Sequence, residues 1–377
     1  MSPDLVVIGG GIAGVSIGYE LAATRRVLVV EAEPTLAVHS TARSAATYIP
    51  GHGVPAVRAL IAASGPRFAR LAEELDAPPL LSPRPVLWAA FDDEGERAVE
   101  RLLAERAGEP GAPVPVEAGE AVRRCPVLRP AAVRAAGLTV ASADLDAMAL
   151  HQAYVRGLRR RGAAVRSDSP VTGLAPTGSG WRVRIGGGDH IDVPDVVDAA
   201  GAWADALAVL AGVRPIGLTP LRRTIALARV PEPDRLRPPD GSALPMVIEV
   251  GERFYFKAET GHLLVSPGDE TPAEPGDARP TDVDVALALE RVQAVTTLGL
   301  RSIQTAWAGL RSFVPDRGPV VGSWPEHPGF HFFAAQGGSG IESAPALAAL
   351  GAAVVTGAPV PTDVGVDPAA VSPSRLM

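Results

Sequence analysis

Residues 5–34 read LVVIGGGIAGVSIGYELAATRRVLVVEAEP, and they carry the strongest fold signal of the chain. An apolar run, a glycine-rich turn, an amphipathic helical pattern and a second apolar run follow one another in this stretch. This order predicts a strand, a helix and a second strand, which together form a βαβ unit.

The glycines of this turn have the spacing Gly9-x-Gly11-x-x-Gly14, and Glu31 ends the second predicted strand. In a dinucleotide-binding fingerprint the first glycine permits a tight turn, the second lets the backbone approach a pyrophosphate, and the third lets the helix pack on the strand. The helix N-terminus would attract the phosphates, and Glu31 would bind ribose hydroxyls. A purely structural glycine turn is the alternative, but the complete context favours a site for FAD or NAD over NADP.

The length suits two domains, or one domain elaborated by a second, and the composition is ordinary for a soluble enzyme. The chain has 377 residues, of which 47% are hydrophobic and 20% charged. Its net charge is −7 and no stretch combines clustered cations with aromatic residues, so we expect no nucleic-acid partner. The single cysteine, Cys125, excludes an internal disulfide and suits a reducing cytosol. We predict no signal peptide, no transmembrane segment and no metal site, and a cytoplasmic location.

The rest of the chain predicts an inserted domain. Stretches such as PMVIEVGERFYFKAETGHLLVSP, from residue 245, alternate like antiparallel strands, whereas the C-terminal part returns to a strand, a glycine turn and a helix. We predict an α/β fold with an α+β insert. A Rossmann-like cofactor domain would comprise residues 1–80, 143–216 and 306–377, and a substrate domain with an antiparallel sheet would comprise residues 81–142 and 217–305.

Four further motifs follow the glycine turn: HSTARSAA (39–46), DAAGAWAD (198–205), WAGLRSFVPD (307–316) and AAQGGSGIESAPA (334–346). By itself the first would also suit a solvated helix cap. Together and in this order, the motifs resemble the D-amino-acid oxidase-like flavoprotein superfamily, which includes glycine oxidase and sarcosine oxidase. Shared stretches such as LLSPRP and AGVRPIGL make the D-arginine dehydrogenases the most similar group, and the resemblance covers essentially the whole chain.

The resemblance implies a non-covalently bound FAD and a set of residues that contact it. These are Gly9, Gly11, Ile12, Ala13, Gly14, Glu31, Ala32, Ser40, Thr41, Arg43, Ser44, Ala45, Val171, Ala200, Gly201, Trp203, Gly309, Gly337, Gly340 and Ile341.

Arg311 stands in an apolar run, where an unpaired charge would cost several kcal/mol. Its partner is either a protein acid, such as Asp316, or a ligand. The resemblance implies that Arg311 binds the carboxylate of an amino acid, with Tyr255 sharing this role. It also implies a further cation at Arg222, although the adjacent Arg223 leaves the register open by one residue. A strand aromatic without a catalytic role is the alternative for Tyr255.

The sequence departs from the D-arginine enzymes at the expected substrate pocket, to which we assign Thr47, Tyr48, His52, Val86, Gly338 and Ser339. Val86 stands where those enzymes place a glutamate, so we expect a neutral substrate side chain in place of a cationic one. Gly51 and Gly53 suit a mobile lid segment around His52. A solvated loop histidine is the alternative for His52.

The predicted reaction is oxidative deamination of an amino acid of D configuration. Hydride would pass from Cα to flavin N5, and the imino acid would hydrolyse to a 2-oxo acid and ammonia. The alternatives are oxidation of a secondary or cyclic amine, of a 2-hydroxy acid or of a larger biosynthetic intermediate, and a flavin-binding protein without turnover. The electron acceptor stays open. Lys257, the only lysine, does not align with the oxygen-activating lysine of sarcosine oxidases, which favours a dehydrogenase.

Overall fold

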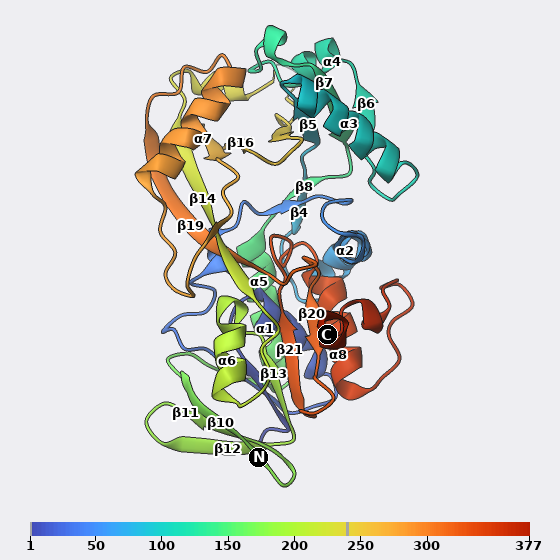
Figure 1. Cartoon of the computed structure of the whole chain (residues 1–377), viewed down its shortest axis with the longest axis vertical. Coiled ribbons are helices and arrows are strands. Elements are labelled where there is room, and N and C mark those ends of the chain that lie inside the picture. Colours follow the sequence, from blue (N-terminus) through green and yellow to red (C-terminus); the bar gives the residue numbers. More distant parts are fainter. Residues whose placement is uncertain (1, 239–240) are drawn as a thin grey trace.

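The computed structural model describes residues 2–238 and 241–377. Met1 and residues 239–240, which the predicted domain bounds include, lie outside the described residues. Figure 1 shows an elongated molecule with two lobes, in which a mostly parallel sheet occupies the lower lobe and a larger sheet occupies the upper lobe. The α/β fold class predicted from the sequence is confirmed.

The lower sheet contains six strands and is parallel except at one edge, where β20 runs antiparallel to β21. The predicted βαβ unit lies at its centre, with β1 paired to β2 from Leu5–Val27 to Ile8–Val30. In spatial order the strands are β20 (Val320–Gly322), β21 (Phe330–Ala334), β13 (Asp195–Asp198), β1 (Leu5–Ile8), β2 (Val27–Val30) and β9 (Ala164–Arg166).

Both faces of the lower sheet are covered, which explains why its central strands are continuous apolar runs. One face packs against α1 (Ile12–Leu21), α2 (Pro55–Glu74), α5 (Ala147–Arg160) and α8 (Ala344–Thr356). The other face packs against α6 (Ala204–Leu210) and an antiparallel meander of β10 (Val171–Thr177), β11 (Gly180–Ile185) and β12 (Asp189–Val193).

The upper sheet contains nine strands and is antiparallel, as predicted, except that β15 and β5 are parallel. Its main path runs β18 (Thr271–Pro272), β14 (Thr219–Arg229), β17 (His262–Ser266), β16 (Tyr255–Glu259), β15 (Met246–Glu249), β5 (Val86–Ala90), β7 (Ala135–Thr139) and β6 (Val114–Val116). The ninth strand, β19 (Ile303–Phe313), pairs with β14. A small sheet of β3 (Thr47–Tyr48), β8 (Ala143–Leu145) and β4 (Leu81–Pro83) completes the strands.

The two faces of the upper sheet belong to different apolar clusters. One face packs with α4 (Ala118–Arg124) and α7 (Asp282–Val295). The other face forms a smaller cluster of Ile49, Val86, Trp88, Ile225, Met246, Ile248, Tyr255 and Leu264. We call this second set the pocket-side cluster. The helix α3 (Asp93–Arg106) packs against β5 and β7.

The long pair β14 and β19 connects the two lobes (Figure 1). Its register runs from Thr219 opposite Phe313 to Ala228 opposite Ile303. The domain boundary predicted between residues 305 and 306 therefore falls inside one continuous strand. The division into two domains stays a prediction, because this strand belongs to both lobes.

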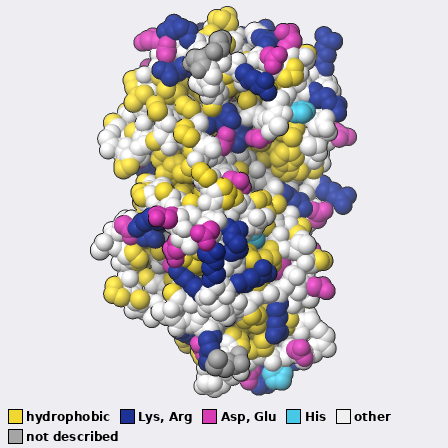
Figure 2. All heavy atoms as spheres, turned by 180° about the vertical axis from the view of Figure 1, so that it is seen from behind, with side chains coloured by type: hydrophobic (Ala, Val, Ile, Leu, Met, Phe, Trp, Pro, Cys, Tyr) yellow, Lys and Arg dark blue, Asp and Glu magenta, His cyan; other side chains and the backbone are white. Residues whose placement is uncertain are grey.

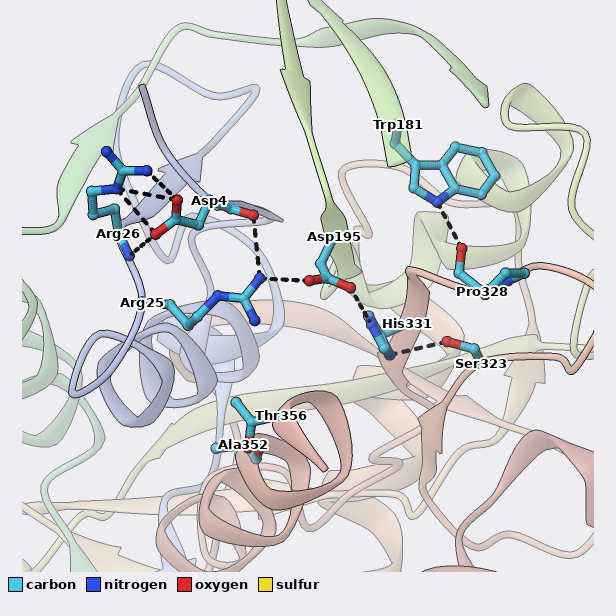
Figure 3. Close-up of polar contacts among 10 residues, drawn as sticks. All are labelled: Asp4, Arg25, Arg26, Trp181, Asp195, Ser323, Pro328, His331, Ala352 and Thr356. Carbon is cyan, nitrogen blue, oxygen red and sulfur yellow. Dashed lines mark hydrogen bonds and ion pairs between the residues drawn. The ribbon is translucent and has the colours of Figure 1, made fainter. Parts of the chain in front are cut away.

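Polar contacts tie together the amino ends of the lower strands, as Figure 3 shows. Arg25 donates to Asp195 at 2.6 Å, Asp195 contacts His331 at 3.1 Å, and His331 contacts Ser323 at 3.0 Å. The contacts among Arg25, Asp195, His331 and Ser323 stabilise the end of the sheet opposite the cavity.

Seen from behind, arginines gather in the lower lobe with acids beside them (Figure 2). None of the helices in the described part of the chain is long and apolar enough to cross a membrane.

Candidate active site

A cavity of about 490 Å³ lies at the carboxyl ends of β1, β2, β13 and β21 and reaches the side of β14 and β19. This is the position at which open α/β sheets bind their ligands. Of the predicted cofactor residues, all but Gly14 line it: Gly9, Gly11, Ile12, Ala13, Glu31, Ala32, Ser40, Thr41, Arg43, Ser44, Ala45, Val171, Ala200, Gly201, Trp203, Gly309, Gly337, Gly340 and Ile341.

The glycine turn leaves no room for side chains at two of its three positions. Gly9 has φ +116°, and a Cβ on it would lie 2.4 Å from the carbonyl oxygen of Ala199. A Cβ on Gly14 would lie 1.8 Å from the carbonyl oxygen of Gly9, which explains why Gly14 packs behind the cavity rather than lining it. At Gly11 a Cβ would meet only Thr41 Oγ1, at 3.2 Å. The first turn of α1 therefore presents backbone N–H groups to the cavity, as a pyrophosphate requires.

Hydrogen bonds hold both the backbone N–H and the backbone carbonyl of Gly10, which lies within this turn. Its N–H donates to Glu31 Oε2 at 2.6 Å, and its carbonyl oxygen accepts from His151 Nε2 at 2.9 Å. His151 lies on α5 and is buried, and burial lowers the pKa of its imidazole, which favours a neutral ring that donates from Nε2. No sequence pattern indicated this role, because His151 lies 141 residues from Gly10.

The HSTARSAA segment forms a 3-10 turn (Ser40–Arg43) that is bound to β19. Ser40 Oγ donates to the carbonyl of Leu310 at 2.7 Å, and Arg43 Nη1 donates to that of Ala308 at 3.1 Å. Trp307 Nε1 returns a hydrogen bond to the carbonyl of Arg43 at 3.0 Å. The segment is therefore part of the cavity wall and more than a solvated cap.

These features fit FAD. A turn with room for a pyrophosphate, an acid at the end of β2 and a cavity that continues to β14 and β19 match the parts of this cofactor. Glu31 and the turn would hold the adenosine and pyrophosphate, and the loop at residues 337–341 would approach the flavin.

Arg311 lines the same cavity and has no partner within the described residues 2–238 and 241–377. Asp316, the protein acid considered from the sequence, is bound instead by Arg375 at 2.7 Å. Burial lowers the pKa of the Arg311 guanidinium, and the nearby Arg223 lowers it further. A Cβ on Gly338 would lie 3.1 Å from Arg311 Nη1, so Gly338, which also lines the cavity, leaves the guanidinium accessible. A partly buried cation without a protein partner is suited to an anionic ligand.

The register ambiguity between the two adjacent arginines has a structural answer. Arg223 lies opposite Gly309 on the pair β14–β19, and both line the cavity. Arg222 points to the other side, where its Nη2 donates to Asp284 Oδ2 in the first turn of α7 at 2.6 Å. The structure thus places Arg223, not Arg222, at the cavity, because side chains alternate along a strand.

Tyr255 belongs to the pocket-side cluster and is buried. Its hydroxyl has no hydrogen-bond partner in the part of the chain that the structure describes. A buried hydroxyl without a partner is costly unless a ligand satisfies it. Tyr255 lies near enough to Arg311 to interact with it electrostatically, although Tyr255 is not among the residues that line the cavity.

The remaining predicted pocket residues do not line the cavity. Val86 is fully buried in the pocket-side cluster, and Thr47 Oγ1 lies 3.6 Å from Met246 Sδ of that cluster. Tyr48 packs edge-on against Phe68 of α2, away from the site. Ser339 is buried and its carbonyl accepts from Ser343. His52 lies between two carboxylates, as described below.

Several cavity residues had not been assigned from the sequence, among them His39 and Gln336. The ring of His39 packs on Trp203 at 4.7 Å, and its Nε2 lies 2.9 Å from Glu33. His39 is the first residue of the HSTARSAA motif, and this position could have identified it as a cavity residue. Lys257 is buried and bound to Asp144 at 2.8 Å. Among the described residues, no cluster of acids, histidines or cysteines could hold a metal ion.

Comparisons with known proteins concern the family and the fold of the chain. The model of the DAO family, described as FAD dependent oxidoreductase, matches residues 4–354. Glycine oxidase of Pseudomonas putida is 26% identical over 389 residues, covering 99% of each chain. The structure superposes on L-proline dehydrogenase from P. horikoshii with a TM-score of 0.85 and 23% identity, covering 99% of this chain and 97% of that one. It superposes on glycine oxidase from Geobacillus kaustophilus with a TM-score of 0.85 and 22% identity, covering 99% of both.

Proposed function

The chain belongs to the DAO family of FAD dependent oxidoreductases, and on this basis we propose that it oxidises the Cα–N bond of a small amino acid held by its carboxylate. The observation that carries the proposal is Arg311, a cation that forms no hydrogen bond or ion pair with any described residue and lines the cavity that continues from the cofactor residues. A carboxylate is the ligand group that matches its planar fork of donors.

Three side chains would bind and orient this carboxylate. Arg311 donates two parallel hydrogen bonds to it, and the unsatisfied hydroxyl of Tyr255 donates a third. Arg223 is 4% exposed and already bound to the carbonyl of Asp269 and to Glu270, so it adds positive potential without being free to move. Two fixed cations and one hydroxyl determine the plane of the carboxylate and hence the direction of the Cα–H bond.

An apolar wall borders the cavity on the side of the upper sheet. Ile225 lines the cavity, and Val86, Trp88 and Ile248 belong to the same cluster without lining it; none of these side chains is an acid that would pair with a cationic group. We propose a neutral side chain, because a desolvated cation would lack a partner against this wall. The D configuration is part of the proposal and is supported by the sequence resemblance alone.

The reaction balances as a two-electron oxidation. A non-covalently bound FAD would supply the acceptor for the Cα hydrogen and for both electrons of its bond. The amine loses a proton to water, and the resulting imino acid adds water and releases ammonia, giving the 2-oxo acid. The chain supplies positioning, electrostatic stabilisation and exclusion of water.

The test is anaerobic reduction of the purified FAD-loaded protein. The panel pairs neutral D- and L-amino acids with the amines that lack their carboxylates, such as D-leucine, L-leucine and 3-methylbutylamine. We expect the flavin absorbance to bleach with the D-amino acids and not with the amines. Bleaching by the amines at the same rate would remove the carboxylate role, and no bleaching across the panel would remove the proposed activity.

Product analysis separates the remaining alternatives. A primary amino acid yields ammonia, whereas N-methyl glycine or proline yields none as its first nitrogen product. Bleaching by the L-amino acids alone would correct the proposed configuration. A repeat in air with peroxide detection shows whether oxygen is the acceptor.

A further inference from the structure

His52 lies between two carboxylates, and this cluster is separate from the carboxylate site proposed above. His52 Nε2 is 3.2 Å from Glu252 Oε1, and His52 Nδ1 is 3.6 Å from Glu342 Oε1. Nε2 is within hydrogen-bond distance of its carboxylate, whereas Nδ1 and Glu342 form an ion-pair contact without a hydrogen bond. Burial lowers the pKa of the ring, but the two carboxylates outweigh it and raise the pKa to about 10, which favours the imidazolium. The His52 ring also stacks against Trp88, with 6.3 Å between ring centroids.

The two acids differ in how firmly they are held. Glu342 precedes α8, its side chain is 6% exposed, and its Oε2 accepts from the N–H of Ile49 at 2.8 Å. Glu252 lies in the turn between β15 and β16, has φ +58° and has a side chain that is 46% exposed. His52 is the only described residue to which the Glu252 carboxylate is bound. Glu252 is therefore free to turn if His52 is removed.

Short segments of chain connect the cluster with the surroundings of Arg311. Gly338, against which Arg311 packs, lies four residues before Glu342. The carbonyl oxygen of Glu252 lies 2.1 Å from where a Cβ on Gly268 would be, and the backbone carbonyl of the next residue, Asp269, accepts a hydrogen bond from Arg223 Nε at 2.8 Å. Arg223 and Arg311 line the same cavity.

Electrostatics agree with this placement. The His52 imidazolium lowers the pKa of Glu252 to about 2 against the opposing effect of burial, and Arg311 and Arg223 lower it further. Glu252 is thus an ionised carboxylate in the field of an unpaired arginine. A carboxylate and a guanidinium in this relation would normally form an ion pair, because each charge is costly to leave without a partner.

We propose that His52 is a positioning residue that holds the Glu252 carboxylate away from Arg311 and so keeps the guanidinium free for the carboxylate of the substrate. Glu252 is then an internal competitor of the substrate, and the clamp formed by His52 and Glu342 restrains it. This inference rests on the proposed function of Arg311 as the carboxylate anchor.

The test measures binding of benzoate to the oxidised, FAD-loaded protein by the change in flavin absorbance. Benzamide, which has the same shape without the charge, is the control ligand. We expect His52→Asn to weaken benzoate binding at least about tenfold, which corresponds to about 1.4 kcal/mol, and to leave benzamide binding unchanged. The double variant His52→Asn/Glu252→Gln should restore benzoate binding, because a neutral amide competes poorly for Arg311.

Two results would overturn the inference: a double variant that binds benzoate as weakly as His52→Asn, or Glu252→Gln alone weakening benzoate as much as His52→Asn does. His52→Gln serves as a second variant, and FAD content and melting temperature show whether each variant is folded. Arg311→Met separates the two proposals. If it leaves benzoate binding intact, the anchor role fails; if it abolishes binding while the double variant shows no rescue, only the role of His52 fails.

Discussion

Replacement of Arg311 by methionine should make the protein less active and more stable at the same time. The side chain of methionine follows the path of the arginine stem but carries no charge. Arg311 loses no ion pair in this change, because none is formed within the described residues, and the change removes a desolvated cation that lies near Arg223. Relief of an unsatisfied buried group is worth about 1–3 kcal/mol. We expect the melting temperature to rise by at least about 2 °C in a domain of this size.

The same substitution should also weaken the stabilisation of the transition state for substrates that carry a carboxylate. Loss of a desolvated charge pair with the substrate costs about 2–5 kcal/mol, which lowers kcat/KM by about 30-fold to about 5,000-fold. The loss should vanish for amines without a carboxylate. Arg123→Met is the matched control, because the Arg123 side chain is 72% exposed on α4 and should change neither quantity.

The assay is calorimetry of the FAD-loaded protein together with steady-state kinetics on a carboxylate substrate and its decarboxylated amine. A fall of several degrees in melting temperature for Arg311→Met would show that the guanidinium has a structural partner. Equal losses for both substrates would show that it does not bind the carboxylate. Either result would refute the reasoning from the missing ion pair.

Three further predictions follow from the contacts. Gly14→Ala should abolish FAD binding in a flavin-content assay, because its Cβ would lie 1.8 Å from the carbonyl oxygen of Gly9, whereas Gly178→Ala, with no atom within 4 Å, should retain FAD. Arg223→Met should raise KM for the substrate, whereas Arg222→Met should leave KM unchanged and lower the melting temperature by breaking its ion pair with α7; equal effects on KM would contradict the assigned register. His151→Leu should raise the Kd of FAD about tenfold by freeing the Gly10 carbonyl. Because burial lowers the pKa of His151 in the folded state, its contribution to stability is lost as the pH falls below about 6.5, so the wild-type melting temperature should drop more steeply than that of His151→Leu between about pH 7 and pH 5.

The sequence predicted the features that depend on local patterns. Residues 5–8 and 27–30 are uniformly apolar, which is why parallel buried strands could be predicted there, and the glycine spacing located the turn between β1 and α1. Alternation along residues 246–266 predicted the upper sheet, although the parallel pairing of β15 with β5 depends on chain segments far apart in sequence.

The features that depend on tertiary contacts could not be predicted in the same way. Two adjacent arginines on a strand point to opposite sides, and only the packing of α7 against β14 identifies which of them faces the cavity. The partners of His52 lie 200 and 290 residues along the chain, so its sequence neighbourhood offered only a lid segment or a solvated loop. The sequence analysis assigned Val86 to the substrate pocket, whereas the structure places it in the pocket-side cluster and not among the residues that line the cavity.

Arg311 shows how the sequence and the structure contribute different steps to one inference. A cation in the run WAGLRSF implies that some anion is nearby, and the sequence offers many acids. In the structure, the acids nearest in sequence or space have other partners. Asp316 is bound by Arg375, Glu270 by Arg223 and Arg317, and Glu252 by His52. Each neighbouring carboxylate that has another cation makes an internal pair with Arg311 less favourable, because that pair would strand the cation left behind. This arrangement supports the proposal that the partner of Arg311 is a carboxylate that arrives from solution.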